Sequence, residues 1–413
     1  MYSTSSTFRL GIPYLITSVA WQTAVVVTTG TDSADRMFRW PRLRALSLFC
    51  LALVICICTA VWLLREHKGG RTLQPQLYRA STIGPSNYLL LPGQTTTLCT
   101  SHGFKTWPHR ERKIYDLFML STELDWLDIR LHTLSPYVDY FVIVESATTF
   151  TGHAKPLYLT ENWARFAAFH HKVILRVIED PGSSVGSRTW DHEDYLRNSL
   201  LYNVFPSLVG TPQEAQINDV LLVSDVDEVP KPETLVVLRL CSFPARLTLR
   251  SHFYYYSFQW LHRGEQWPHP QATVYKGLSD TVSPKDLRNG ESRLGWFFLD
   301  ALRCWRNKAE LFNAAWHCSS CFPTLSEMQT KMNSFSHTGY NTAENRDAEV
   351  IRDRVQQGLD LFGRQSEIYD RFMDNLDAPA YILQQQDRFG YLLNRDGDDA
   401  GFTDWYNITK KAE

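Results

Sequence analysis

One uninterrupted apolar segment near the N-terminus constrains this chain most strongly. Residues 45–64 read ALSLFCLALVICICTAVWLL and contain no charged side chain. A helix rises about 1.5 Å per residue, so a segment of this length matches a hydrocarbon core of roughly 30 Å. A buried core helix of the same length would carry polar residues on some face, and the WLLREHK that follows lacks the small-residue cleavage site of a signal peptide. The segment therefore predicts a single-pass transmembrane signal-anchor.

The composition on either side of this segment predicts five parts. Residues 1–44 are expected to form a cytoplasmic tail, of which 1–36 are a candidate N-terminal extension, because Met37 begins the compact start MFRWPRLR before the anchor. Residues 65–112 are rich in Gly, Pro, Ser and Thr, which is typical of a linker-like stem. Residues 113–395 are expected to form one folded head and 396–413 a C-terminal tail. Since the head follows the anchor, we expect a type II orientation with a luminal head.

The charge balance argues against a nucleic-acid partner. The chain has 42 Lys and Arg against 44 Asp and Glu, so its net charge is −2. Proteins that bind nucleic acid without sequence preference need a basic surface to neutralise phosphates. The composition therefore gives no electrostatic indication of general nucleic-acid binding.

Eight cysteines are present, three in the apolar segment and five beyond it. The five are Cys99, Cys241, Cys304, Cys318 and Cys321. In an oxidising compartment some of them should pair, and their odd number leaves at least one without an intramolecular partner. The Cys-x-x-Cys spacing at the last two is compatible with zinc, but a zinc site needs a second pair of ligands. We therefore expect a local disulfide there.

Short apolar runs alternate with amphipathic stretches from residue 113 onward. The runs are KIYDLFML (113–120), DYFVIVE (139–145), KVILRVI (172–178) and DVLLVS (219–224). Thr122 and Asp125 form a capping-box-like pattern before leucines at helical spacing, and residues 190–205 also indicate a helix. Continuous apolar strands that alternate with helices predict an α/β fold, in which a mostly parallel sheet is flanked by helices.

Two aspartates directly follow the last of these runs. In an extended conformation Asp225 and Asp227 would face the same side of the chain, about 6–7 Å apart. Open α/β sheets bind ligands at the carboxyl ends of their strands. Paired carboxylates there suit one hard divalent cation opposite a diphosphate, and oxygen ligands favour Mn²⁺ or Mg²⁺ over zinc. The alternative is an acidic turn ended by Pro230 and Pro232, but the position after a buried strand favours a metal site.

Several ordered motifs resemble glycosyltransferase family 17, over a range from about residue 114 to 393. They are VESATTFTGHAKPLYL (144–159), VSDVDEVPKPE (223–233), AAWHCSSCFP (314–323) and RFMDNLDAPAYILQQQDRFGYLL (371–393). The resemblance implies a GT-A-like fold, UDP-N-acetylglucosamine as donor, and a mannose-containing N-glycan or related glycoprotein as acceptor. It also implies inversion at the anomeric carbon, Mn²⁺ or else Mg²⁺ at Asp225 and Asp227, and a Golgi membrane setting.

Further site residues are assigned by this resemblance. Glu145 ends the second predicted strand, where a GT-A-like sheet would meet the nucleotide. Phe150 is expected either to stack on the base or to anchor its loop in the core. Arg197 either reaches a phosphate or forms a salt bridge with Glu193, four residues earlier on an exposed helix face.

An inverting transfer needs a general base beside the acceptor hydroxyl. The chemically eligible side chains are Glu228, Glu265, Asp300, Glu310, His317 and His337. His317 either lines the acceptor side or packs in the core beside the cysteines. The aromatic run at 250–260 offers stacking faces for sugars, but we expect most of it in the core and one or two side chains at the cleft.

Two other classes of protein fit parts of this pattern. A membrane-tethered carbohydrate-binding module would keep the aromatic residues but would need no paired acids at a strand end. A metal-dependent phosphodiester hydrolase usually needs several His and Asp ligands for two metals, and the sequence has no such cluster. A glycosyltransferase with a nucleotide-sugar donor and a glycan acceptor is therefore the function that the sequence favours.

Overall fold

The structure is a computed structural model that describes residues 52, 54–59, 71–72, 92–109, 111–180, 182, 188–290, 308–334 and 338–409. Its contacts divide the chain into two units, Met1–Gly69 and Gly70–Glu413. Most of the predicted anchor at 45–64 lies outside the described residues, as does the predicted tail at 1–44. No helix among the described residues is both long and apolar enough to cross a membrane.

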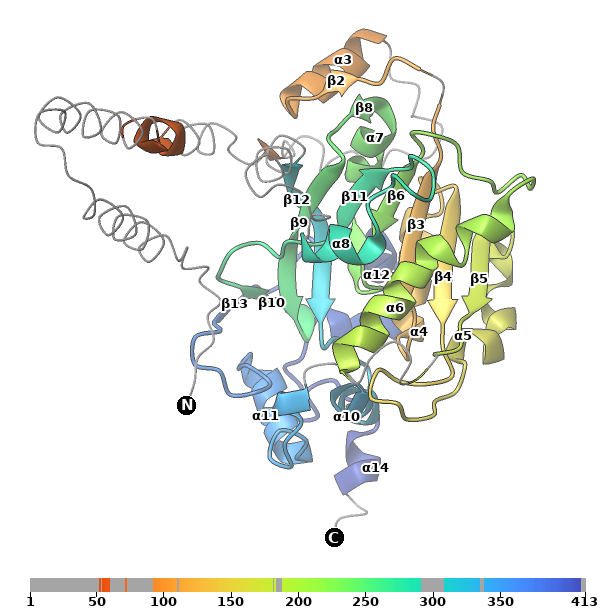
Figure 1. Ribbon diagram of the computed structural model, residues 1–413. Helices are drawn as coiled ribbons and strands as arrows, with labels where there is room; N and C mark the ends of the chain where they lie inside the picture. Colours follow the sequence, from red (N-terminus) through yellow and green to blue (C-terminus); the bar gives the residue numbers. More distant parts are fainter. Residues whose placement is uncertain are drawn as a thin grey trace, which may run out of the picture. The chain divides into compact units, whose positions relative to one another are not determined.

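The second unit is built around a mixed sheet of eleven strands (Figure 1). The strands are β1 (Arg71–Thr72), β3 (Ile114–Met119), β4 (Tyr140–Glu145), β5 (Val173–Val177), β6 (Val220–Val223), β7 (Glu228–Pro230), β9 (Arg246–Tyr255), β10 (Ser257–His262), β11 (Gln271–Val274), β12 (Lys308–Ser319) and β13 (Tyr369–Arg371). The main path is β1-β12-β9-β11-β6-β3-β4-β5. β10, β13 and β7 pair at its margins.

The prediction of an α/β fold with a sheet flanked by helices is confirmed, but the mostly parallel sheet is wrong. β6, β3, β4 and β5 do run parallel to one another, and β12 runs parallel to β9. β11, however, lies antiparallel between β6 and β9, and β7 pairs antiparallel with β12. The sheet is mixed because β11 returns from the β9–β10 hairpin into the gap between β6 and β9, a pairing that local periodicity does not encode.

Helices cover both faces of the sheet and bury its alternating side chains. One core contains inward residues of α4 (Leu124–Leu134), α5 (Tyr158–Glu161), η3 (Trp163–Phe169), α7 (Pro232–Leu240), α12 (Ala380–Gln384), α13 (Gln386–Phe389) and η7 (Gly390–Leu392). The other contains residues of α6 (Thr189–Tyr202), η5 (Phe205–Leu208) and α8 (Pro284–Asn289), with α6 and α8 crossing the nearer face in Figure 1. Ile114 and Phe118 of β3 enter the first core, whereas Tyr115 and Leu117 enter the second.

A third core joins the C-terminal part of the chain to the β9–β10 end of the sheet. It contains residues of α10 (Leu325–Ser334), α11 (Ala348–Gln357) and α14 (Trp405–Thr409), and η6 (Thr338–Tyr340) connects the first two. Tyr255 of β9 stacks on Tyr369 of β13 here, with ring centroids 4.7 Å apart. Of these segments, α10 places Lys331 beside Asp227 in the turn that joins β6 to β7.

Part of the segment predicted as stem is attached to the head. Residues 92–109 form α3 (Pro92–Ser101) and β2 (Lys105–Thr106), and β2 pairs with β8 (Cys241–Ser242) in a small second sheet. A disulfide joins Cys99 to Cys241. Although its composition is typical of a linker, this segment is therefore covalently attached to the C-terminal end of α7.

Candidate functional site

Asp225, Val226, Asp227 and Glu228 form an acidic turn between β6 and β7, closed by a hydrogen bond from the Glu228 amide to the Asp225 carbonyl at 3.1 Å, so the extended conformation expected for this segment is wrong. Arg130 of α4 holds the backbone of this turn. The Arg130 Nη1 donates to the carbonyl oxygens of Asp225 (3.1 Å), Val226 (3.3 Å) and Glu228 (2.8 Å). Its Nε and Nη2 donate to the two oxygens of Asp116, at 2.7 and 2.6 Å, and both of these charged side chains are fully buried. A single buried guanidinium therefore sets the path of the turn.

The carboxylate of Asp225 lies between two arginines. Its Oδ1 accepts from Arg197 at 3.0 Å and its Oδ2 from Arg288 at 2.5 Å. The Asp225 side chain is 39% exposed, so it is the accessible acid of the turn. Burial raises its pKa, but the positive charges of Arg288 and Arg197 outweigh that effect, and the net pKa lies below the ordinary value of an aspartate.

Arg197 connects this carboxylate to α6. Its Nη2 donates to Glu193 at 2.8 Å, which confirms the salt bridge predicted from their spacing. The helix face is not exposed, however, because the Arg197 side chain is only 3% accessible. The same guanidinium thus bonds to both Glu193 and Asp225, so the ion pair is part of the site.

Glu228 is fully buried and saturated with hydrogen bonds. Arg288 donates to both of its oxygens, at 2.8 and 3.0 Å, the Trp267 indole donates to Oε1 at 2.7 Å, and the Asp225 amide donates to Oε2 at 2.8 Å. Burial opposes its negative charge, yet the charge and hydrogen bonds of Arg288 hold the pKa of Glu228 well below its ordinary range. A carboxylate that is this acidic and fully bonded serves to position Arg288 and is a poor proton acceptor.

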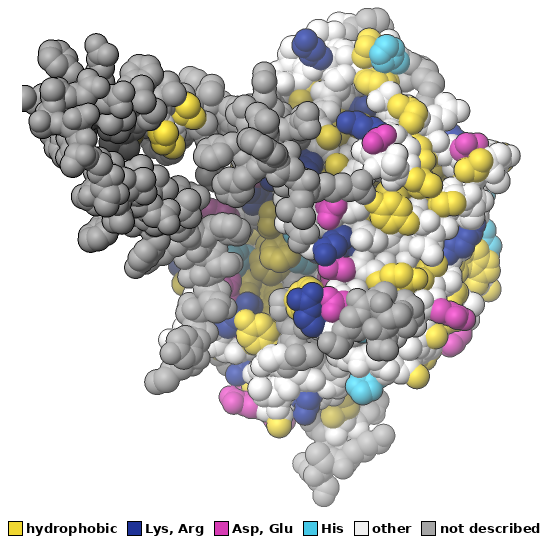
Figure 2. All heavy atoms as spheres, in the orientation of Figure 1, with side chains coloured by type: hydrophobic (Ala, Val, Ile, Leu, Met, Phe, Trp, Pro, Cys, Tyr) yellow, Lys and Arg dark blue, Asp and Glu magenta, His cyan; other side chains and the backbone are white. Residues whose placement is uncertain are grey.

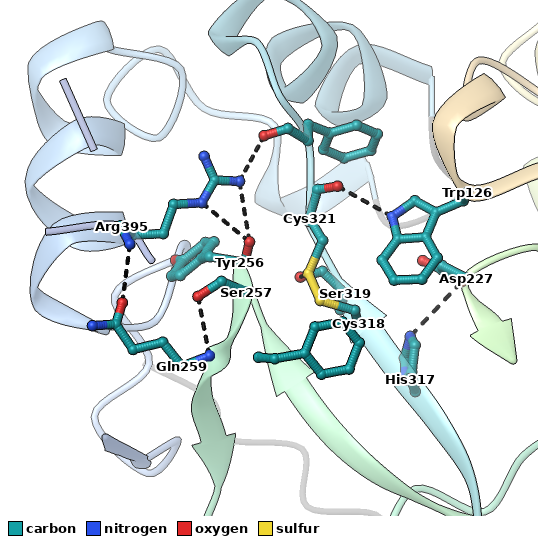
Figure 3. The surroundings of a disulfide bond; sticks show 12 residues. Trp126, Asp227, Tyr256, Ser257, Gln259, His317, Cys318, Ser319, Cys321 and Arg395 are labelled. Atoms are coloured by element: carbon teal, nitrogen blue, oxygen red, sulfur yellow. Dashed lines mark hydrogen bonds and ion pairs between the residues drawn. A yellow bond between two sulfur atoms is a disulfide. The ribbon is translucent and has the colours of Figure 1, made fainter. Parts of the chain in front are cut away.

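Asp227 faces Lys331 and His317. The Lys331 Nζ lies 3.5 Å from Asp227 Oδ2 and 3.5 Å from Glu123 Oε1, and the His317 Nε2 lies 3.9 Å from Asp227 Oδ1. Figure 3 shows the His317 ring directed toward Asp227. Burial raises the pKa of Asp227, and the charges of Lys331 and His317 only partly oppose the rise.

Aromatic side chains form a wall next to the acidic turn. The Phe253 ring stacks on His317 with centroids 4.9 Å apart, and Trp267 lies 5.0 Å from His317 and 5.5 Å from Phe253. Most of the aromatic rings in the run at 250–260 are buried, which confirms that part of the expectation, whereas Phe253 is half-buried beside His317 and the expected contact with a sugar stays a prediction. On the face seen in Figure 2, acidic and basic side chains gather beside a hollow with a hydrophobic floor.

The disulfide between Cys318 and Cys321 lies at the end of β12, directly after His317. This pairing confirms the expected local disulfide. The Cys318 amide donates to the Asp227 carbonyl at 3.3 Å, and the Trp126 indole of α4 donates to the Cys321 carbonyl at 3.1 Å (Figure 3). The disulfide turn thus connects α4 to the acidic turn.

Two residues expected at the nucleotide have other contacts. Glu145, at the end of β4, is buried and accepts from the amides of Leu159 (2.8 Å) and Thr160 (3.2 Å), so its carboxylate caps the first turn of α5. Phe150 is partly buried and packs against the core under α6 and α8, which agrees with the loop-anchor alternative. Both side chains thus have structural contacts, and their expected role at the nucleotide stays a prediction.

The other candidates for a general base are scattered. Glu265 is exposed in the turn after β10, and Glu310 on β12 pairs with Arg250 at 2.8 Å. Asp300, His337 and also Cys304 lie outside the described residues. Of the base candidates that the structure describes, Glu228 lies in the acidic turn and His317 lies beside it.

Three of the most closely involved residues were not found from the sequence. Arg288 and Lys331 lie about 60 and 100 residues beyond the acidic turn in unremarkable helical segments, and no local pattern marks them. Arg130 had a detectable signal, because Asp116 interrupts an otherwise apolar strand and a buried aspartate requires a charged partner. Within the described parts of the chain, no group of three or more His, Cys, Asp or Glu side chains is placed to hold a metal ion.

Comparisons with known proteins agree with the resemblance drawn from the motifs. The chain is 27% identical over 305 residues to beta-1,4-mannosyl-glycoprotein 4-beta-N-acetylglucosaminyltransferase of Homo sapiens, covering 68% of this chain and 55% of that enzyme. The enzyme of the same name from Rattus norvegicus is 26% identical, covering 68% and 54%. The chain spans about half the length of the curated relatives it matches.

A solved structure is also similar to part of the chain. It is a mannosyltransferase from Pyrobaculum calidifontis in complex with GDP-Man and Mn²⁺, with 11% identity and a TM-score of 0.31, covering 62% of this chain and 66% of that one. The profile of glycosyltransferase family 17 matches residues 42–294 and 302–397, which is most of the chain. The chain therefore belongs to glycosyltransferase family 17.

Proposed function

We propose that this protein transfers N-acetylglucosamine from UDP-N-acetylglucosamine to a mannose-containing N-glycan or a related acceptor, with inversion at the anomeric carbon. The observation that carries the proposal is the acidic turn at the carboxyl end of β6, where Asp225 is accessible and lies between two arginines. Family membership and the names of the relatives support the choice of sugar. A GT-A-like use of the parallel strands β3 to β6 as the nucleotide-binding half is part of the proposal.

The residues present fit a divalent cation that is held partly by its substrate. Asp225 and Asp227 would supply carboxylate oxygens to Mn²⁺, or to Mg²⁺, and diphosphate oxygens and water would complete the coordination. When bound, such a cation neutralises charge that develops on the departing nucleoside diphosphate. Two carboxylates are enough for a site of this kind, because hard cations in nucleotide enzymes are often bound by one or two carboxylates and the substrate.

The chain's own side chains would perform the remaining tasks. Arg197 and Arg288 place positive charge beside Asp225, where the diphosphate would lie. The faces of Phe253 and Trp267 offer apolar surface to a sugar ring. Inversion requires a general base beside the acceptor hydroxyl, and Glu265, Glu310 and His317 stay proposed for that role.

A Golgi location with a single-pass type II anchor at 45–64 and a luminal catalytic domain is part of the proposal. It is supported by the uncharged apolar sequence and by the position of the head after it. Protease protection of intact vesicles tests the topology: an N-terminal epitope should be digested without detergent, and a C-terminal epitope only after detergent is added. Digestion of the C-terminal epitope in sealed vesicles would contradict a luminal head.

A donor screen tests the proposed reaction. The purified full-length chain is incubated with Mn²⁺, a mannose-terminated N-glycan and each of several nucleotide sugars, and linkage analysis identifies any product. We expect transfer from UDP-N-acetylglucosamine with a β-linked product. Glycan binding without turnover of any donor would instead support a binding module, and release of nucleotide without transfer would support a hydrolase.

A further inference from the structure

We infer that Arg288 competes with the divalent cation for Asp225 and becomes a ligand of the donor's diphosphate once the cation is bound. The inference rests on the proposed function, because it needs a nucleoside diphosphate and a cation at the acidic turn. It assigns a role to a residue outside every sequence motif, at the C-terminal end of α8. Its consequence is that cation and nucleotide strengthen each other's binding.

Both carboxylate oxygens of Asp225 are occupied by arginines. Arg197 bonds to Oδ1 at 3.0 Å and Arg288 bonds to Oδ2 at 2.5 Å. A cation that approaches Asp225 must therefore displace a guanidinium or bind beside two of them. A cation bound at Asp225 would lie next to positively charged guanidinium groups, and like charges at short range repel one another. Binding of the cation without a diphosphate is therefore disfavoured.

Arg288 can lose its hydrogen bond to Asp225 and still be held at the site by Glu228. Its Nη1 and Nη2 also donate to the two oxygens of Glu228, at 2.8 and 3.0 Å, and Glu228 is fully buried. Breaking the single contact with Asp225 leaves this bidentate pair intact. Nη2 is then available for a new acceptor, and a phosphate oxygen suits the planar guanidinium fork.

The other cations of the site are less suited to this exchange. Arg197 is 3% exposed and is held between Glu193 and Asp225, whereas Arg288 is 12% exposed. Lys331 contacts Asp227 and Glu123, at 3.5 Å each. Arg197 and Arg288 both combine a second carboxylate partner with a contact to Asp225, but Arg288 is the more exposed of the two and its second partner, Glu228, is fully buried and bound by two hydrogen bonds.

Coupling between the two ligands follows from this arrangement. The cation frees Arg288 for the diphosphate, and the diphosphate removes the repulsion between Arg288 and the cation. Binding coupling is reciprocal, so UDP should raise the affinity for Mn²⁺ by the same factor by which Mn²⁺ raises the affinity for UDP.

The experiment measures Mn²⁺ binding to the full-length chain in detergent, by electron paramagnetic resonance, with and without saturating UDP. We expect UDP to raise the Mn²⁺ affinity of the wild type by about tenfold or more, within the range of coupled sites. In Arg288→Gln the affinity for Mn²⁺ alone should increase about fivefold, because a nearby like charge is gone. The effect of UDP should fall to about twofold, because the diphosphate loses a ligand.

Arg239→Gln is the matched control. Arg239 of α7 is also 12% exposed and also bonds to a carboxylate, that of Asp139 at 2.8 Å, but it does not contact the acidic turn. This variant should bind Mn²⁺ and UDP as the wild type does.

Because Arg288→Gln removes the partner of a buried glutamate, Arg288→Lys is measured as well. It should keep the weak affinity for Mn²⁺ alone and lose most of the UDP effect.

The outcomes separate the inference from the proposed function. If the wild type binds no UDP with Mn²⁺, the proposed donor is wrong. If the wild type shows coupling and both Arg288 variants behave like Arg239→Gln, Arg288 has no role in it and the inference is overturned. A folded Arg288→Gln that binds Mn²⁺ alone more weakly than the wild type also overturns it, since competition predicts the opposite sign.

Discussion

Arg130 shows how one residue sets the geometry of the acidic turn. Three backbone carbonyls of the turn accept from its Nη1, and Asp116 fixes the other side of the guanidinium. Only arginine presents several donors in a fixed planar fork, so lysine keeps the charge opposite Asp116 but loses most of these bonds. The position of Asp225 and Asp227 should therefore depend on the shape of this side chain as well as on its charge.

Arg130→Lys should reduce sugar transfer more than tenfold while the protein remains folded. The lost hydrogen bonds to buried groups should lower the free energy of unfolding by about 1–3 kcal/mol. Urea unfolding and donor turnover measure the two effects. Arg239→Lys is the control, because Arg239 also bonds to backbone carbonyls and one aspartate, away from the turn. Equal losses of transfer in the two variants would show that Arg130 has no special relation to the site.

Asp377 ties the C-terminal segment to the sheet. Its oxygens accept from Lys231 (2.6 Å), His252 (2.5 Å), Tyr254 (2.9 Å) and Trp316 (2.8 Å). Burial raises its pKa, but the hydrogen bond from His252 and the charge of Lys231 outweigh it and depress the pKa of Asp377 below its ordinary value. The Lys231 side chain is only 1% exposed, and its burial lowers the pKa of Lys231 more than the charge of Asp377 raises it.

The stabilisation by Asp377 should disappear in acid. Its pKa in the folded state is lower than the unfolded value of about 3.9, so its contribution is fully present above about pH 5 and is lost as the pH falls through the folded pKa. Asp377→Asn should lower the free energy of unfolding by about 2–4 kcal/mol at pH 7, because Lys231 loses its counter-charge. Urea unfolding between pH 7 and pH 3 should show this difference shrinking below about pH 4. A difference that grows in acid would contradict the assignment.

At the scale of elements, the strands of the parallel half were predictable and their later partners were not. β3, β4, β5 and β6 coincide with the four apolar runs, because strands buried on both faces read as continuous apolar sequence. The antiparallel insertion of β11 depends on contacts between distant segments. The start of α4 was also mispredicted, since Thr122 makes no side-chain cap and its amide instead donates to Glu123 at 2.9 Å.

The same contrast holds for the candidate site. Asp225 and Asp227 were predicted as site residues because they follow a strand, and the carboxyl end of a strand is a ligand-binding position in α/β folds. Arg288 and Lys331 reach the turn from helices that follow much later in the chain, so their contacts with Asp225 and Asp227 could not be predicted from local sequence patterns. Glu145 is the last residue of β4, and its carboxylate accepts from two amides in the first turn of α5.

The two disulfides should differ in what they support. Cys99 and Cys241 are 142 residues apart, whereas Cys318 and Cys321 are three residues apart and flank the contacts to Asp227 and Trp126. A long closed loop restricts the unfolded chain far more than a short one. The first bridge should therefore matter for stability and the second for the geometry of the site.

Paired Cys→Ser variants test this division. Replacing Cys99 and Cys241 should lower the free energy of unfolding by about 2–5 kcal/mol and leave the kcat of the folded protein within about twofold. Replacing Cys318 and Cys321 should cost clearly less stability but reduce kcat by about tenfold, because His317 and Asp227 lose their support. Thermal unfolding and initial rates distinguish the two results. The reverse pattern would contradict this division of roles between the two bridges.

At the scale of the whole molecule, the family assignment and the predicted membrane anchor have different support. Family membership covers most of the chain, whereas the membrane anchor is a prediction from residues 45–64. If the prediction is right, the full-length chain should stay in the membrane pellet after a carbonate wash and enter the detergent phase. A chain that starts at residue 65 should be recovered in the soluble fraction, and equal partitioning of both would exclude this segment as the anchor.

The most direct test of the acidic turn as the catalytic centre compares sugar transfer by the wild type and by Asp225→Asn. Both full-length proteins are assayed with UDP-N-acetylglucosamine, Mn²⁺ and a mannose-terminated N-glycan, and Asp370→Asn serves as the control because Asp370 pairs with Arg263 on the surface. We expect Asp225→Asn to lower kcat/KM by about 100-fold or more and the control to stay within about twofold of the wild type. Transfer by Asp225→Asn at the rate of the control would contradict a catalytic role for the acidic turn.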